Sequence, residues 1–459
     1  MSAVFNLHLQ DHAGTRIAVY DPFNSTLIWK DSGEEIIQSV PELLQEKIST
    51  VSPQTPVGKA VSLNKIKIQM GFACNYSCTY CSQNNQRAFQ KDTALQTLAK
   101  VPVFLDKMRQ WFDGGSDGLG GGVRLEFWGG ETLLYWNAVE LMARELRTLY
   151  PNIGLGLFTN GSILTPEMAE TAAEIKLHFI VSHDGPTFTE DRAKDPFDIP
   201  DQCENLQYLF NRLNPLNLIS FNATISPKNY SLLTIRKYIA DKLGVDPQLV
   251  RLTHDLATPY DSAGMSYVSH PDKRRDLING IFSEMVKQYP FELNVGMVDE
   301  IIHDFFQSIK GNRSSSVVGQ KCGMDLPTSL AVDIDGNVLT CQNVTAKGGH
   351  KIGHVDEYKD VELNTAYHWS NREECVKCPV VQICKGACMF LTDKLWTGAC
   401  DQHFTWSLAY LALALYLQTN SYLTKIEGEA IRKNEVLSID VLYCEVKKLG
   451  DDNLLRGMN

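Results

Sequence analysis

Three closely spaced cysteines constrain this chain more than any other feature. Cys74, Cys78 and Cys81 are separated by three and then by two residues. They follow an apolar-alternating run at residues 66–70, which predicts a strand. One short loop can therefore hold three irons of a four-iron cube and leave the fourth iron open. An open iron of this kind can bind S-adenosylmethionine and release a carbon radical from it. A three-cysteine zinc site or unrelated buried thiols are the alternatives.

Three further segments follow in a fixed order. Gly129 and Gly130 precede Glu131, and two glycines let a backbone approach a ligand closely while the glutamate supplies a negative charge. Residues 157–162 and 180–186 end two more strand-like runs. Each segment alone would be an ordinary turn. Together, in this order, they are hard to obtain by chance.

These segments resemble the signature of the radical S-adenosylmethionine superfamily. The resemblance implies that the three loop cysteines are catalytic through the cluster they hold, that Tyr80 packs near the adenine, and that Glu131 and the preceding glycines receive the methionyl ammonium. The cofactor-binding residues that it implies are Tyr80, Gly129, Gly130, Glu131, Asn160, Ser182 and Asp184.

Seven more cysteines gather within about eighty residues near the end of the chain: Cys322, Cys341, Cys375, Cys378, Cys384, Cys388 and Cys400. Such a set forms disulfides in a secreted protein or zinc sites in an intracellular one. The first ten residues lack the basic head and apolar core of a signal peptide, so we expect a cytoplasmic protein. Reducing cytosol disfavours disulfides. Zinc stays open because Cys-x2-Cys is also a zinc spacing.

The seven-cysteine spacing resembles the SPASM domain, which holds auxiliary clusters in the peptide- and protein-modifying branch of the superfamily. The resemblance implies two auxiliary 4Fe–4S clusters, and hence three 4Fe–4S clusters with S-adenosylmethionine. The outer cluster would be held by Cys375, Cys378, Cys384 and Cys400, and the inner one by Cys322, Cys341 and Cys388. For the missing fourth inner ligand, Asp325, Cys203 and an open, substrate-accessible iron are the alternatives. Cys203 and Cys444 are otherwise expected to be buried apolar thiols.

Composition excludes two classes of partner. The chain of 459 residues carries a formal net charge of -11, which argues against nucleic acid, because phosphate binding needs a basic surface. The longest apolar stretch, residues 406–417, is too short to cross a bilayer and predicts a buried helix, so we expect no membrane partner. An apolar content of 44% is enough for a substantial interior.

The pattern of strands and helices predicts an α/β fold of several parts. Strand-like runs alternate with helical patterns over residues 63–260, which indicates parallel βαβ units. The resemblance implies a partial (β/α)6 TIM-type barrel that is open on one side. The other expected parts are a small N-terminal α+β domain (1–62, three strands and a helix over 33–48, either a leader-peptide recognition domain or a β-rich cap), a helical bridge (261–320), the SPASM domain (321–405) and C-terminal helices (406–459).

One residue helps to choose among the activities that the resemblance implies. Anaerobic sulfatase maturases, which make formylglycine, carry an aspartate base directly after the second auxiliary cysteine. Here Gln342 follows Cys341, and an amide cannot take up a proton as a carboxylate does. We therefore expect an oxidoreductase that cross-links side chains of a ribosomally made precursor peptide with a leader, through a carbon–carbon, ether or thioether bond. A flavodoxin- or ferredoxin-type protein would supply electrons. A non-catalytic cluster-binding scaffold is the alternative of another class.

Overall fold

The structure is a computed structural model, and it describes residues 3–40, 50–59, 61–89, 92–112, 119–257, 271–288 and 296–428. Six parallel strands form the centre of its largest sheet. In chain order these strands are β5 (Leu63–Gln69), β6 (Leu119–Trp128), β7 (Gly154–Thr159), β8 (Leu177–Ser182), β9 (Ile219–Ile225) and β10 (Leu252–Leu256). Each pairs in parallel with the next, which confirms the α/β class and the partial barrel.

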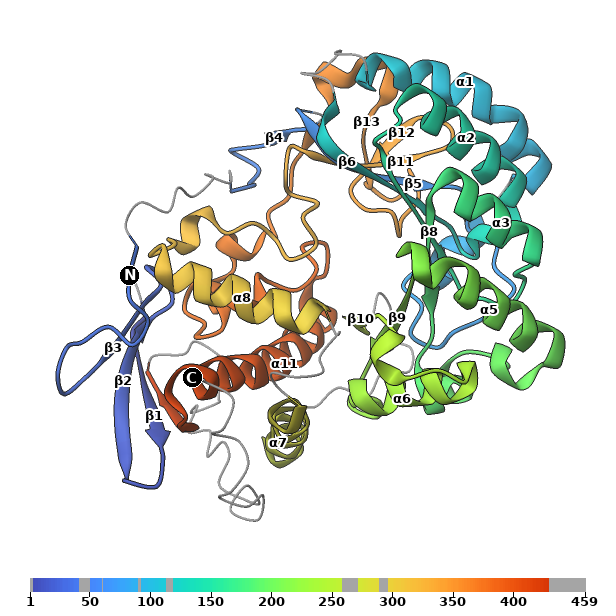
Figure 1. The fold of residues 1–459 in the computed structure, drawn as a ribbon. Coiled ribbons are helices and arrows are strands. Elements are labelled where there is room, and N and C mark those ends of the chain that lie inside the picture. Colours follow the sequence, from blue (N-terminus) through green and yellow to red (C-terminus); the bar gives the residue numbers. More distant parts are fainter. Residues whose placement is uncertain are drawn as a thin grey trace.

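Helices cover the outer face of this sheet, as Figure 1 shows. They are α1 (Ala94–Phe112), α2 (Trp136–Leu149), α3 (Pro166–Ile175), α5 (Pro200–Leu213) and α6 (Leu232–Leu243). The one-turn helix α4 (Phe188–Asp191) instead packs through Phe188 against the loop after β5. Alternation along the strands explains the arrangement. Ile66 and Ile68 of β5 are fully buried in the main apolar core, whereas Lys65 and Lys67 face the opposite side, where they line a cavity.

The barrel sheet continues beyond its sixth strand into the cysteine-rich part of the chain. Strand β11 (Ser329–Asp333) pairs in parallel with β5, and β12 (Asn337–Leu339) and β13 (Lys351–His354) follow in antiparallel pairing. The resulting order is β10-β9-β8-β7-β6-β5-β11-β12-β13. Residues after 321, expected as a separate domain, thus contribute three strands to the same sheet. The small strands β4 (Val57–Gly58) and β14 (Glu362–Leu363) pair with each other.

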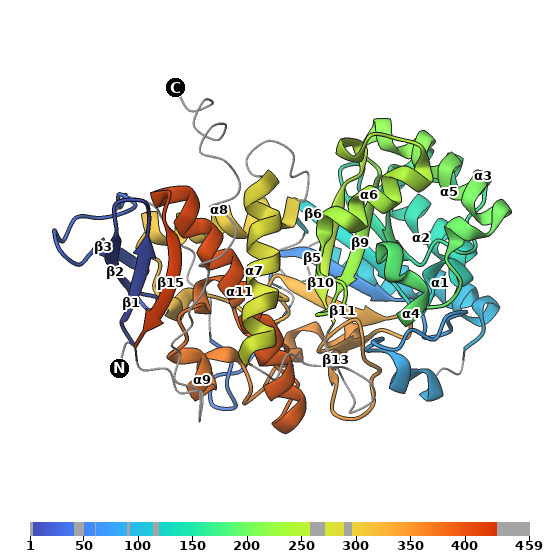
Figure 2. The same cartoon turned by 90° about the horizontal axis from the view of Figure 1, so that it is seen from below.

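Long helices connect the barrel to the far end of the molecule (Figure 2). Helices α7 (Pro271–Gln288) and α8 (Gly296–Lys310) fall within the expected bridge and pack against α11 (Asp393–Thr419). Helix α11 is buried from residue 402 to 415, in agreement with the buried helix predicted for residues 406–417. The short helices α9 (Glu373–Val376) and α10 (Val381–Cys384) precede it. Among the described helices, none combines the length and the apolar character needed to span a bilayer.

A second sheet joins the two ends of the chain. Strands β1 (Phe5–Gln10), β2 (Thr15–Asp21) and β3 (Thr26–Trp29) lie where strands were predicted. Strand β15 (Tyr422–Glu427) pairs with β1, giving the order β15-β1-β2-β3. The expectation of helices alone over residues 406–459 is therefore wrong at β15. Figure 2 shows β15 beside β1, with the long helices between this sheet and the barrel.

The helix predicted over residues 33–48 is also wrong where the structure describes it. Residues 33–40 are irregular, because their backbone groups bond to β3 instead of to one another. The Trp29 amide donates to the Glu34 carbonyl (2.8 Å), and the Ile36 amide donates to the Leu27 carbonyl (3.0 Å). Residues 41–48 of this prediction lie outside the described residues.

Candidate functional site

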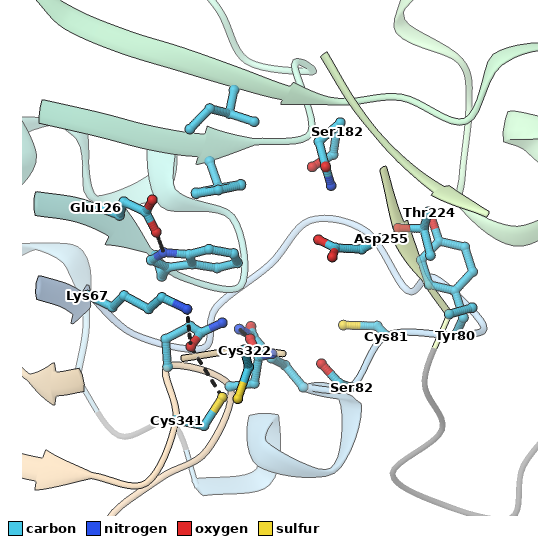
Figure 3. A pocket seen from close by; sticks show the side chains of 18 of the residues that line it. Lys67, Tyr80, Cys81, Ser82, Glu126, Ser182, Thr224, Asp255, Cys322 and Cys341 are labelled. Carbon is cyan, nitrogen blue, oxygen red and sulfur yellow. Dashed lines mark hydrogen bonds between the residues drawn. The ribbon is translucent and has the colours of Figure 1, made fainter. Parts of the chain in front are cut away.

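A cavity of about 820 Å³ lies on the inner face of the barrel sheet. Its lining includes Cys74, Cys78 and Cys81 from the loop after β5, and Cys322, Cys341 and Cys388 from the cysteine-rich part of the chain. Figure 3 shows Cys81 on one side of this pocket, Cys322 and Cys341 close together on another, and Asp255 directed into it. A volume of this size is in the range that holds a cofactor and part of a substrate.

The loop after β5 is held in shape by its own backbone. The Cys81 amide donates to the Cys78 carbonyl (3.2 Å), and the Asn84 side-chain amide donates to the same carbonyl (2.8 Å). Burial is the main reason that the pKa of the Cys78 thiol is raised to about 11; Arg192 acts in the opposite direction, and the neighbouring Cys81 and Cys74 thiols contribute to the rise. The three cysteines are therefore close enough to interact, as a shared cluster requires.

The glycine pair packs against the cysteine loop. The Gly130 amide donates to the Gly71 carbonyl, and the Glu131 amide donates to the Ala73 carbonyl, both at 2.8 Å. A Cβ atom on Gly130 would lie 2.4 Å from the Ala73 carbonyl oxygen. The sequence suggested that these glycines make room for a ligand. The structure shows a different reason for a glycine at position 130: the absence of a side chain makes room for the loop that carries the cysteines.

Glu131 is buried, and the hydrogen bonds of its carboxylate link the end of β6 to the end of β7. Its Oε1 accepts from the Leu133 amide (2.9 Å) and the Thr159 hydroxyl (2.7 Å), and its Oε2 accepts from the Asn160 amide (2.7 Å). Burial raises its pKa, and these hydrogen bonds act in the opposite direction. A carboxylate has about four acceptor positions, so one remains for a bound ammonium.

Asn160 continues this network into the cysteine loop. Its side-chain amide donates to Asn75 Oδ1 (2.9 Å), and its Oδ1 accepts from the Ser162 amide (3.0 Å) and hydroxyl (2.6 Å). Asn75 in turn donates to the Ser162 hydroxyl (2.8 Å). The end of β7 thereby fixes the loop between the first and second cysteines.

Arg192 is a site residue that the sequence analysis missed. Its Nε and Nη2 donate to the two carboxylate oxygens of Asp184 (2.6 and 3.0 Å), and the Tyr80 hydroxyl donates to the same carboxylate. Burial acts against ionisation, but Arg192 and these hydrogen bonds hold the pKa of Asp184 below its usual range. Asp184 thus positions Tyr80 and Arg192, whereas Ser182, two residues earlier, lines the cavity. A signal was available: an arginine eight residues after Asp184.

The inner cysteines meet at the opposite wall of the cavity. Burial is the main reason that the pKa of the Cys322 thiol is raised to about 12, and the neighbouring Cys341 and Cys388 thiols contribute to the rise. Gln342 Oε1 accepts from both Lys67 Nζ and the Cys341 thiol, each at 3.2 Å (Figure 3). Burial raises the pKa of the Cys341 thiol as well. Lys67 acts in the opposite direction on Cys341 and Cys322, and to that extent it favours the thiolate form.

The outer cysteines form a separate group around α9, α10 and the start of α11. Burial raises the pKa of Cys375, and the thiols of Cys400, Cys384 and Cys378 raise it further. Apolar side chains that include Trp369 and Trp396 surround this group. The seven cysteines therefore separate into the two sets that the sequence resemblance implied, and soft sulfur donors suit an iron–sulfur cluster. In the part of the chain that the structure describes, no three Cys, His, Asp or Glu side chains are arranged around a position for a single metal ion.

Neither of the two residues considered for the open inner position, Cys203 and Asp325, lines the cavity. Cys203 is on α5 at the outside of the barrel, where its charged neighbours are Lys242 and nearby acids. Asp325 is fully buried, and its Oδ2 accepts from the Gln320 amide (2.7 Å) and from His368 Nε2 (3.2 Å). Its Oδ1 has no hydrogen-bond partner among the residues that the structure describes, but Asp325 does not line the cavity. Cys444 lies outside the described residues.

Comparison with known proteins agrees with this geometry. Residues 68–209 match the family described as the Radical SAM superfamily. A protein named radical SAM cyclopropyl synthase TigE, from Paramaledivibacter caminithermalis, is 21% identical over 398 residues, which are 81% of this chain and 77% of TigE.

Solved structures with a similar fold include two of anSMEcpe with bound AdoMet and a peptide. The structure with the Cp18Cys peptide has a TM-score of 0.53 and 17% identity, and that with the Kp18Cys peptide has 0.55 and 18%. Each comparison covers 78% of this chain and 98% of the other. The cysteine loop at the end of β5 lies inside the matched region, so residues 68–209 are the radical SAM domain of an enzyme, and the solved structures share the fold.

Proposed function

We propose that this enzyme is a peptide maturase that cross-links side chains of a ribosomally made precursor. The observation that carries the proposal is the shared cavity: the three loop cysteines and the three inner cysteines line the same 820 Å³ space. A substrate in this space would contact both the place where a hydrogen atom is removed and the place where an electron leaves. Net oxidation of this kind forms a carbon–carbon, ether or thioether bond.

The proposed cofactors follow from the three cysteine sets. Cys74, Cys78 and Cys81 would hold the first 4Fe–4S cluster, and the inner and outer sets would hold one each. When bound, the first cluster and S-adenosylmethionine supply a carbon radical able to abstract hydrogen from an unactivated carbon. The chain's own part is to orient the cofactor through Tyr80 and Glu131, and to exclude water from the cavity. A small flavodoxin- or ferredoxin-type donor remains part of the proposal.

A peptide substrate is supported by the anSMEcpe structures, which hold AdoMet and a peptide on the same fold. Formation of formylglycine is less well supported. Gln342 occupies the position of the expected aspartate base, and its side-chain oxygen accepts from Lys67 Nζ. A neutral amide in this place cannot accept the substrate proton. The intact cysteine loop likewise disfavours a non-catalytic scaffold, because a scaffold has no need of an open iron.

Ring formation within one residue is a second candidate, and the name of the relative TigE, a cyclopropyl synthase, favours it. A cyclopropane also forms by joining two carbons of the substrate with loss of two hydrogen atoms. The two candidates therefore place the same demands on the cavity, and they differ only in which carbons are joined.

Mass spectrometry of a candidate precursor tests the proposal. Reduced, iron-loaded enzyme is incubated with S-adenosylmethionine and short peptides encoded next to its gene. We expect 5′-deoxyadenosine and a peptide lighter by two hydrogen atoms for each new bond, with fragment spectra that separate a cross-link from a ring within one residue. Oxidation of a serine CH2OH or cysteine CH2SH group to an aldehyde, detected with a carbonyl-selective reagent because the serine reaction also removes two hydrogen atoms, would support formylglycine formation and overturn the proposal.

A further inference from the structure

The lining of the cavity has a charge opposite to that of the whole chain. The formal net charge of the chain is -11. Among the described residues that line the cavity, however, basic side chains outnumber acidic ones. The basic residues are Lys65, Lys67, Arg87, Arg124, Arg192, Arg251 and Lys321, and the acidic ones are Glu126, Glu131 and Asp255. A cavity lined by more basic than acidic side chains attracts anions, even in a protein whose overall charge is negative.

Four of these cations lie on the barrel strands or directly before one, and we call them the cationic arc: Lys65, Lys67, Arg124 and Arg251. Lys65 and Lys67 lie on β5, Arg124 is on β6, and Arg251 directly precedes β10. Lys65 and Arg124 are paired in register across β5 and β6. Their neighbours Ile66 and Leu125 point outward into the apolar core, so strand alternation directs the cations inward.

One carboxylate balances only part of this charge. Glu126 Oε1 lies 2.9 Å from Arg124 Nε and 3.8 Å from Lys65 Nζ, and Glu126 Oε2 accepts from the Trp128 indole (3.2 Å). The two Nη groups of Arg124 have no acceptor among the described residues, and about half of this side chain is exposed to the cavity. Glu126 itself is only 6% exposed, so it orients Arg124 and leaves the outer edge of the guanidinium free.

The remaining neighbours of the arc do not neutralise it. Burial, with Arg124 and Arg251 nearby, lowers the pKa of His178 to about 4, so this imidazole is neutral at pH 7. Burial raises the pKa of Asp255, and Lys321, Lys67 and Lys65 act in the opposite direction, but among the described residues no lysine or arginine forms an ion pair with it within 4.0 Å. Arg251 Nη2 donates to the neutral side chain of Asn217. The arc therefore keeps a net positive charge.

The arc is also distinct from the expected S-adenosylmethionine residues. Glu131, Asn160 and Asp184 follow the carboxyl ends of β6, β7 and β8, next to the cysteine loop. Lys65, in contrast, lies near the start of β5, Arg124 on β6 is paired with it in register, and Arg251 precedes β10. In parallel strands these positions correspond to a deeper level of the barrel.

We propose that the cationic arc binds a carboxylate of the peptide substrate, either an Asp or Glu side chain or the C-terminal carboxylate. This inference rests on the proposed function, because it assumes a peptide in the cavity. The free Nη groups of Arg124 can hold a carboxylate through two parallel hydrogen bonds, and Lys65 and Lys67 add point charges beside it. The arc would thereby select acidic peptides and set which residue faces the cysteine loop.

Binding of defined peptides tests the proposal without any turnover. The probes are three pentapeptides: acetyl-Ala-Gly-Glu-Gly-Ala amide, the same peptide with Gln in place of Glu, and the Gln peptide with a free C-terminal carboxylate. Calorimetry is carried out on the anaerobic, iron-loaded enzyme saturated with S-adenosylmethionine. We expect one of the two acidic peptides to bind about tenfold more tightly than the neutral one, and the preferred peptide identifies the source of the carboxylate.

Matched variants separate the arc from general charge effects. Lys65→Gln and Arg124→Gln should each remove most of this preference. Lys237→Gln and Arg212→Gln, which change exposed cations on α6 and α5, should keep it. In a reversed-charge test, Lys65→Glu should bind acetyl-Ala-Gly-Lys-Gly-Ala amide more tightly than the Glu peptide, an effect that a merely misfolded variant would not produce.

Three results would overturn the inference. They are equal affinity for all three probes, an unchanged preference in both arc variants, and weakened binding of S-adenosylmethionine instead of the peptide in those variants. Failure of the proposed function is distinguishable from these, because an enzyme that produced no cross-link could still show the carboxylate preference.

Discussion

Asp184 shows how much of a residue's task depends on neighbours that are distant in sequence. Its place in a Ser-His-Asp-Gly-Pro run predicted a cofactor contact. In the fold its carboxylate is engaged by Arg192, Tyr80 and the Thr224 amide (2.8 Å). The run was recognisable from the sequence, but its hydrogen-bond partners were not, because they come from a helix end and from β9. The same holds for Glu131, whose three hydrogen-bond donors in the protein could not be identified from its Gly-Gly-Glu run.

Arg192→Gln is expected to leave Asp184 as a buried, unpaired carboxylate. We expect a loss of about 3 kcal/mol in the free energy of unfolding, measured by denaturant titration. The lowered pKa of Asp184 stabilises the native state at neutral pH, and this contribution disappears as the pH falls below about 4 through the folded-state pKa. The variant should therefore lose less stability on acidification than the parent. An exposed control, Arg212→Gln, should cost under about 1 kcal/mol.

Gly130→Ala tests why the glycine is needed. The new Cβ would lie 2.4 Å from a backbone oxygen of the cysteine loop, so the loop must shift. We expect the reconstituted protein to lose about four irons per chain. Gly58→Ala is the control, because nothing lies within 4 Å of a Cβ there. Full iron content in Gly130→Ala would show that the contact with the loop is not what requires this glycine.

At the scale of elements, the strands were easier to predict than their partners. The alternating runs of β1, β2 and β3 were evident, and so was the order of the barrel strands. The pairing of β1 with β15 could not be predicted, because it joins residues such as Leu7 and Ile426 that are about as far apart in sequence as this chain allows. The predicted helix over residues 33–48 failed for a related reason. Its backbone groups bond to β3, and periodicity cannot reveal a competing partner of that kind.

This pairing changes the expectation for leader binding. An extended leader could add to an exposed strand edge of the first domain, but residues 34–36 already bond to the edge of β3. Among the described residues, the backbone of β15 pairs only with β1, so its other edge can accept a strand. If the first domain recognises a leader, precursor binding should protect the amides of β15 from hydrogen exchange more than those of β3. Protection of β3, or of neither strand, would contradict this mode and favour a structural cap.

For the whole molecule, the cysteine spacing predicted which cysteines lie together, but it did not predict that strands of the cysteine-rich part belong to the barrel sheet. Cys375, Cys378, Cys384 and Cys400 gather as the resemblance implied. The continuation of the barrel sheet through β11 to β13 could not be foreseen, because strand pairing between β5 and β11 joins residues far apart in sequence. Domain boundaries drawn from composition therefore divide a sheet that is continuous.

Iron content tests the three-cluster proposal for the complete enzyme. Anaerobically reconstituted protein should hold about twelve irons per chain. Replacing Cys74, Cys78 and Cys81 together by alanine should leave about eight, with no cleavage of S-adenosylmethionine. About four irons together with bound zinc in the parent protein would instead assign the cysteine-rich part to zinc.

The pairing of β5 with β11 has a mechanical consequence. The loop with Cys74 leaves the end of β5, and Cys341 follows β12, which is bonded to β11. The two loops thus follow strands of the same hydrogen-bonded sheet, and no hinge separates those strands. Interfaces between separate domains usually permit relative movement. Here the sheet fixes the spacing between the two groups of cysteines in the cavity. If both groups hold clusters, as proposed, a peptide can enter without changing the distance that an electron must cross.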